Sequence, residues 1–281
     1  MKILVTSGAI LMLLFAGICF CRWQGCKRQD ANSHPLGGRS CLDSEKSGIP
    51  SKRLMPQIAA SAEEQSQLVR QSMDTARLPQ AVPMEAKEML RSPPRQEASS
   101  AASSSATVRL AAEKSQLMDD LLNEEPIPSD YGQVMVGLFR DRSQDVYTRD
   151  FAVQHIGLYA EALHRRGAYD SSSPEAAQFR KALDAAADET RTIVAAAAFR
   201  AQDDLAAFDP HVDARRLDAR LVACAADASA APAARVMAVQ LCGERKVAAS
   251  RSLLKRLADD PKANAVVRKA ASHALLALEG R

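Results

Sequence analysis

The sequence predicts an all-α protein: an α-solenoid of about four antiparallel helix pairs, preceded by a single N-terminal transmembrane or signal helix and a disordered linker. Three observations support this fold class. Nine of the 13 prolines lie before residue 129, and only four lie after it. The later stretch is rich in Ala, Leu and Arg, which favour helices. That stretch also repeats a pattern of apolar residues, Asp and Arg, and it shows no strand pattern of any length.

The chain begins with an apolar, uncharged run from Ile3 to Cys21. A helix of about 19 residues is just long enough to cross the hydrocarbon core of a bilayer. Arg22 and Trp23 follow, as is typical of a membrane interface. We expect residues 1–21 to be an uncleaved membrane anchor, with the repeat domain outside the cytoplasm, in the periplasm. A cleaved or lipidated signal ending near Cys19, which would give a lipoprotein or a secreted form, and a buried soluble helix remain alternatives.

Residues 22–106 are irregular in composition, with a low-complexity Ser/Ala run and the pair Pro93-Pro94. Such segments bury too little apolar surface to offset the entropy of ordering the chain. We expect a disordered linker that contains two short helices, at 61–76 and 83–91. Its expected role is to hold the repeat domain away from the membrane.

Residues 107–128 are expected to form an amphipathic capping helix. Leu110, Leu117 and Leu121 recur at helical spacing. The first repeat of a stack has an apolar face that no earlier repeat covers, so a preceding amphipathic helix is expected to pack on it.

Residues 129–281 can be aligned on four recurring arginines: Arg149, Arg191, Arg235 and Arg268. The residues three, six and seven positions later are mostly small or apolar, and these offsets keep to one side of a helix. Eight residues before three of the arginines stands an aspartate: Asp141, Asp227 and Asp260. Each unit therefore reads as a helix, a turn that carries Asp, and a second helix that opens near Arg. The second unit departs from this pattern, because Leu183 stands where the aspartate is expected.

The order of an Asp, Val267-Arg268, small residues and then Ala274-Leu275 resembles the signature of HEAT repeats. This resemblance implies that the second helices of successive pairs line a concave face that binds a protein or peptide. It also implies that the Asp and Arg ladders are structural, linking the turn of one repeat to the helix of the next. On that basis Asp227 is expected to be a buried, paired charge. We therefore expect a non-enzymatic scaffold tethered to a membrane.

The net charge of +3 is small, and from residue 129 onward 22 basic residues face 20 acidic ones. This balance argues against a nucleic acid partner. The last 37 residues differ, with nine basic and three acidic residues. An anion-binding module for nucleic acid or lipid headgroups is therefore the alternative function, using a basic patch of seven residues: Arg245, Lys246, Arg251, Lys255, Arg256, Lys262 and Lys269.

Cys224 and Cys242 occupy equivalent apolar positions in the two helices of one unit, so they are expected to face each other. Two small core residues or a disulfide in an exported domain both fit this placement. His155 replaces a small residue on the packed face and is expected in the core or a groove. The sequence shows no nucleophile elbow, phosphate loop or His-Glu metal motif. We therefore expect no enzyme, cofactor, metal or small-molecule substrate, with an enzyme on a HEAT-like frame as the remaining alternative.

Overall fold

The computed structural model describes residues 80–93 and 102–280, and in the second range it describes side chains from residue 106 onward. Every regular element within these ranges is helical, which confirms the predicted all-α class for this part of the chain. The predicted membrane segment at 1–21 and the predicted helix at 61–76 lie outside the described residues.

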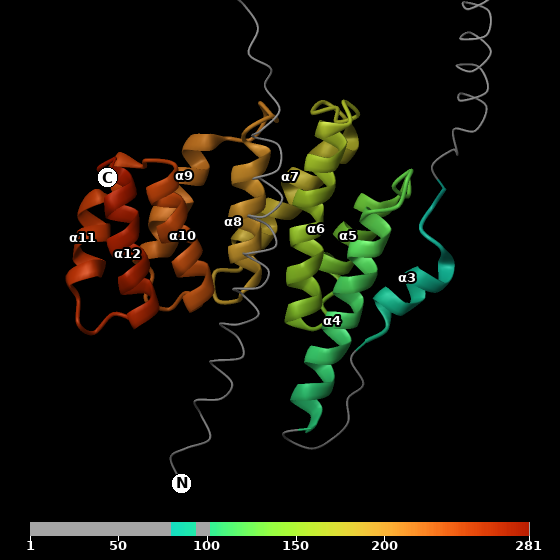
Figure 1. Ribbon diagram of the computed structural model, residues 1–281, viewed down its shortest axis with the longest axis horizontal. Helices are drawn as coiled ribbons and strands as arrows, with labels where there is room; N and C mark the ends of the chain where they lie inside the picture. Colours follow the sequence, from blue (N-terminus) through green and yellow to red (C-terminus); the bar gives the residue numbers. More distant parts are fainter. Residues whose placement is uncertain (1–79, 94–101, 281) are drawn as a thin grey trace, which may run out of the picture. The chain divides into compact units, whose positions relative to one another are not determined.

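Eight of the helices form four antiparallel pairs that follow one another along the chain (Figure 1). The first helices of the pairs are α5 (Tyr131–Arg140), α7 (Pro174–Ala187), α9 (Ala214–Ala226) and α11 (Arg251–Asp259). The second helices are α6 (Val146–Arg165), α8 (Val194–Leu205), α10 (Pro232–Glu244) and α12 (Ala265–Leu278). A short 3₁₀ turn, η2 (Ala248–Ser250), precedes α11. The helices α3 (Met84–Arg91) and α4 (Ala102–Leu122) come before the first pair.

The second helices form a continuous row, because α6 packs on α8, α8 on α10 and α10 on α12. The first helices are less evenly packed. α5 contacts α7, whereas α7 and α9 are not packed closely against each other. The core therefore runs mainly between each first helix and the row of second helices.

Small residues bring the second helices close together. A Cβ atom added to Gly157 of α6 would lie 2.8 Å from the Cβ of Ala201 on α8. At Gly243 of α10, the added atom would lie 2.7 Å from the Cα and 2.9 Å from the carbonyl oxygen of Ala274 on α12. Only residues with little or no side chain allow backbones to approach this closely. The alternation of Gly and Ala in the sequence thus sets the distance between neighbouring pairs.

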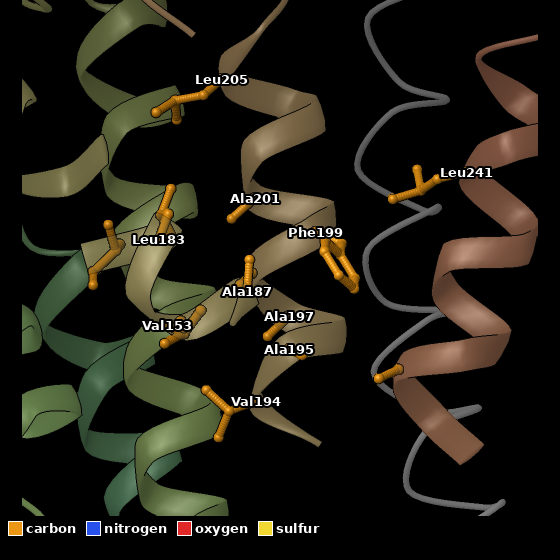
Figure 2. Packing of buried hydrophobic residues seen from close by; sticks show 14 of the residues in the cluster. Val153, Leu183, Ala187, Val194, Ala195, Ala197, Phe199, Ala201, Leu205 and Leu241 are labelled. Atoms are coloured by element: carbon orange, nitrogen blue, oxygen red, sulfur yellow. The ribbon is translucent and has the colours of Figure 1, made fainter. Parts of the chain in front are cut away.

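The core around α8 shows the same economy of size (Figure 2). Ala195, Ala197 and Ala201 of this helix are buried against their neighbours. Phe199, which is 1% exposed, points from α8 toward the side on which Leu241 of α10 lies. One large ring among small side chains fills the space between two pairs while the helices elsewhere stay close.

Most of the second helices begin at a side chain that caps the first turn. Asp145 accepts hydrogen bonds from the backbone N–H groups of Tyr147 and Thr148 at the start of α6. Asn264 accepts from the N–H of Val266 at the start of α12. Such caps satisfy N–H groups that have no partner within the helix. α8 begins without a side-chain cap, which agrees with the irregular second unit seen in the sequence.

Helix α4 packs on α6, in the place expected for a cap of the first pair, and it begins earlier than expected. Residues 80–93, assigned above to the disordered linker, are instead packed on the helices. Val82 and Leu90 are buried, and α3 contacts both α4 and α5. The linker prediction is therefore wrong for these residues.

A buried lysine holds this segment in place. Lys114 of α4 is 0% exposed, and its Nζ donates to the carbonyl oxygen of Ser92 and to Oε1 of Gln144, both at 2.7 Å. Gln144 in turn donates to the carbonyl oxygen of Arg91 at 2.8 Å. Burial lowers the pKa of Lys114, partly offset by Asp145 and Asp141. A charged group at this depth persists only when its protons are matched by acceptors.

We predict that Gly243→Ala destabilises the fold, because the added methyl group meets the backbone of Ala274 and α12 must shift. Overpacking of this kind costs about 1–3 kcal/mol. Gly137→Ala is the matched control: this helical glycine has nothing within 4 Å of an added Cβ, so the change should stabilise by about 0.5–1 kcal/mol. Urea unfolding followed by circular dichroism measures both. Equal effects of the two substitutions would contradict the close approach of α10 and α12.

Candidate binding surface

Two of the recurring arginines tie the helices of one pair together. Arg149 Nε donates to the carbonyl oxygen of Phe139 at 3.0 Å. Arg235 donates from Nε and Nη2 to the carbonyl oxygen of Ala225 at 3.4 and 3.3 Å. Both acceptors lie ten residues back, in the last turn of the first helix. A cation there stabilises carbonyl groups that lack helical partners.

The other two arginines differ from this arrangement. Arg268 is half-buried and donates to the carbonyl oxygen of Pro261 at 3.4 Å. Arg191 lies exposed in the turn before α8. Because α8 begins at Val194, its fourth residue is Ala197, whereas Arg149, Arg235 and Arg268 are the fourth residues of their helices. The alignment of Arg191 with the other three is therefore wrong.

The three aspartates shape turns and do not bridge to the next repeat. Asp141 accepts from the N–H and hydroxyl of Ser143, and Asp227 accepts in the same way from Ser229. Asp260 accepts from the N–H of Lys262 at 2.8 Å. Hydrogen bonds from Ser229 lower the pKa of Asp227. The expectation that Asp227 is a buried, paired charge is therefore corrected: its carboxylate lies near the surface and stabilises a turn.

Links between pairs come from other charged residues. Glu189, in the turn before α8, accepts from Arg149 of the first pair at 2.6 Å. Arg200 of α8 forms a bidentate pair with Glu244 of α10, with distances of 2.8 and 3.1 Å. Arg245 binds Asp203 at 2.7 Å and Asp218 at 2.6 Å. These bonds connect α8, α9 and α10.

The network also divides the basic patch. Arg245 is 16% exposed in its side chain and is committed to its two aspartates, so it offers no free charge to a partner. The other members of the patch are exposed, and no ion pair is found for them among the described residues: Lys246, Arg251, Lys255, Arg256, Lys262 and Lys269. The patch is therefore smaller than the sequence suggested.

The partly exposed sides of three successive second helices form what we call the second-helix face. Its residues recur at helical spacing: Asp150, Gln154 and Glu161 on α6, Arg200 and Asp203 on α8, and Val236, Gln240 and Glu244 on α10. The pair between Arg200 and Glu244 shows that the surfaces of α8 and α10 adjoin. Within the listed residues, four carboxylates stand against one arginine that two of them already neutralise. The face is thus acidic, with amide groups between the charges.

His155 and Tyr131 form a buried polar pair beside this face. His155 Nδ1 lies 2.6 Å from the hydroxyl of Tyr131, which donates to the carbonyl oxygen of Met118 at 3.0 Å. Asp119 Oδ1 lies 3.8 Å from His155 Nε2. These residue types also occur in catalytic relays, but Tyr131 is 0% exposed, so no substrate reaches its hydroxyl. The pair links α4, α5 and α6, as expected for a core histidine.

Cys224 and Cys242 are both buried and free in this structure. Burial is the main reason that the pKa of each thiol is raised to about 11, and Cys242 adds to the shift at Cys224. The two thiols are thus near each other, in α9 and α10, and both stay protonated at neutral pH. This placement fits two small core residues, which was the first of the two expected roles.

The described residues were also searched for metal sites and membrane spans. In this part of the chain, no group of three or more His, Cys, Asp or Glu side chains is placed to hold a metal ion. No helix between residues 80 and 280 combines the length and apolar character that a membrane span needs.

The sequence analysis missed Gln202, which lines a cleft between α7, α8 and α9. A signal was present: Ala198, Gln202 and Leu205 lie on one helical stripe that is otherwise apolar. The partners of Arg200 and Arg245 were missed for a different reason. They lie 27 to 44 residues away, beyond the reach of any local spacing rule.

We predict that Arg235→Met lowers the free energy of unfolding by about 1–3 kcal/mol, because it leaves a buried carbonyl oxygen without its donor. Met keeps much of the apolar stem, so packing changes little. Arg191→Met, in the exposed turn, should change stability by no more than about 0.5 kcal/mol. Urea unfolding of both variants provides the comparison. A similar loss at both positions would show that the carbonyl contacts contribute little.

We predict that His155 makes the fold sensitive to acid. Burial lowers its pKa to about 4, whereas an unfolded histidine titrates near 6.5. Between these values the unfolded chain binds a proton that the folded chain does not, so stability falls as pH drops from about 6.5 to 4. His155→Asn should weaken this dependence, while His273→Asn, at an exposed site, should not. Unfolding free energies at pH 5 and 7.5 test this, and parallel losses in all three proteins would contradict it.

Comparison with known proteins gives no name to this arrangement of helices. The chain matches no known protein family, no curated protein and no solved structure. The functional argument therefore depends on the sequence and on the geometry of the described residues.

Proposed function

We propose that this chain is a non-enzymatic scaffold that binds a protein or peptide through the second-helix face of a HEAT-like α-solenoid. The observation that carries this proposal is the unbroken row of second helices from α6 to α12. A repeat architecture buries each pair only against its neighbours, and it leaves an extended surface available for a partner.

The spacing of the helices supports a concave second-helix face. Gly157 and Gly243 let the second helices approach closely, whereas the first helices α7 and α9 are not packed tightly together. A stack whose one layer is drawn together and whose other layer is spread curves toward the closer layer. The second helices would then lie on the inside of the curve, where a partner contacts several pairs at once.

The chemistry of the face supports a particular kind of partner. Asp150 and Glu161 bring negative charge, and Gln154 and Gln240 carry both donors and acceptors. Amide side chains suit the backbone groups of a bound peptide, and carboxylates suit Lys or Arg side chains. We therefore infer that the partner segment is basic and extended across α6, α8 and α10.

The membrane tether remains part of the proposal on sequence grounds alone. It rests on the uncharged run from Ile3 to Cys21, which lies outside the described residues. An anchor of this kind, with residues 22–79 between it and the helices, would hold the acidic face near a membrane and concentrate it for a partner in the same compartment.

The exposed part of the basic patch favours a second candidate, binding of an anionic ligand to the last pair. Arg251, Lys255 and Arg256 lie on α11, and no ion pair is found for them among the described residues. A nucleic acid or anionic lipid partner would show steep salt dependence of binding. The two candidates use different helices, so they can be separated by position.

We predict that a photo-reactive amino acid at Gln154 or Gln240 crosslinks a protein partner in intact cells, whereas one at Lys181 on the exposed side of α7 does not. The adduct should be lost in Glu161→Lys, because that change reverses the charge of the face, and retained in the matched surface variant Lys181→Glu. Adducts that form only from Lys255 would favour the anion-binding candidate. Adducts insensitive to Glu161→Lys would contradict the second-helix face.

A further inference from the structure

A cleft opens between the first helices α7 and α9, on a different side of α8 from the second-helix face. Its apolar wall consists of Leu183 on α7, Leu205 on α8, Val212 before α9 and Leu217 on α9. This is the place at which neighbouring first helices are not packed closely together. A cleft lined by four aliphatic side chains offers room and apolar contact for one apolar side chain of a partner.

Gln202 places an unused acceptor in this cleft. The residue is only 7% exposed. Its Nε2 donates to Asp184 Oδ1 at 2.9 Å, and its Oε1 is buried with no hydrogen-bond partner in the structure. Asp184 can only accept when ionised, so the orientation of the amide group is fixed by this bond. The exposed acceptor position of the cleft therefore calls for a ligand that brings an N–H or O–H donor.

The three arginines around the cleft differ in how firmly they are held. Arg180 donates to the buried Asp209 at 2.6 Å, and Arg220 donates to Asp184 at 2.5 Å and to Asp188 at 2.8 Å. Arg216 is looser, because its side chain is 59% exposed and its contact with Asp184 is 3.5 Å long. Arg216 is thus the guanidinium at this cleft best able to turn toward an anionic ligand.

We propose that the cleft between α7 and α9 binds the carboxyl terminus of a polypeptide that ends in an apolar residue. The backbone N–H of the last residue donates to Gln202 Oε1. Its carboxylate binds Arg216 at the mouth of the cleft, and its side chain packs on Leu205 and Leu217. One terminal residue carries all three groups, whereas an internal Asp or Glu would put its carboxylate where the aliphatic wall lies.

This site goes beyond the second-helix face and uses none of its residues. Gln202 points to Asp184 of α7, while Arg200, two residues earlier, pairs with Glu244 of α10. The two surfaces therefore lie on different sides of the same helix. One partner or two separate partners could occupy them, and binding at the cleft is testable by itself.

The test measures fluorescence anisotropy of labelled heptapeptides with the full chain in detergent micelles. The peptides end in Leu with a free carboxylate, in Leu-amide, or in Ser with a free carboxylate. We expect the Leu acid to bind at least tenfold more tightly than the other two. Arg216→Gln should weaken binding of the Leu acid at least tenfold, and Arg215→Gln should leave it unchanged, because Arg215 is exposed on the same helix but does not line the cleft.

Gln202→Met tests the acceptor directly, since it keeps the length of the side chain and removes the carbonyl oxygen. Binding should weaken at least tenfold, with the melting temperature recorded as the control for folding. Equal binding of acid and amide, equal effects of Arg215→Gln and Arg216→Gln, or no binding of the Leu acid at millimolar concentration would each overturn the proposal. Glu161→Lys should have no effect here, so failure of the second-helix face and failure of the cleft give different results.

Discussion

The contact on which the rest of this structure depends is the close approach of neighbouring second helices. A single helix pair has too little apolar surface to be stable, so each must bury one side on the next. Gly157 against Ala201 and Gly243 against Ala274 make that burial possible at short range. Phe199 then fills the wider space between α8 and α10. Because this row is continuous, the partly exposed sides of the same helices become one surface.

Charged residues in the stack serve two distinct purposes. Arg149 and Arg235 lie inside single pairs and hold the end of the first helix to the second. Arg200 and Arg245 join different pairs, so they fix how the pairs are rotated relative to one another. Such internally paired charges contribute geometry more than attraction for a partner. The charges left for recognition are those that the network does not use, chiefly the acids of the second-helix face and the cations of α11.

The sequence predicted those parts of the structure that depend on local spacing. The helix pairs, their turns and the roles of Arg149 and Arg235 follow from residues that lie within about ten positions of one another. Arg191 was misplaced because the turn before α8 lacks the aspartate that marks the other turns. The segment 80–93 was taken for linker because Val82 and Leu90 alone make no stripe, and their burial depends on Lys114. Gln202 was missed because its environment is created by three helices, which no single stripe reveals.

The attachment of residues 80–93 has a mechanical consequence. A pull on the chain from its N-terminal side reaches this segment before it reaches any helix pair. The load is first carried by the hydrogen bonds of Lys114 to Ser92 and of Asp130 to Val82, together with the ion pair between Lys87 and Asp130. These few polar bonds act as a clip that gives way under tension while the larger apolar interfaces between pairs stay closed. A protein held at one end would in this way release slack first and keep its binding surface folded.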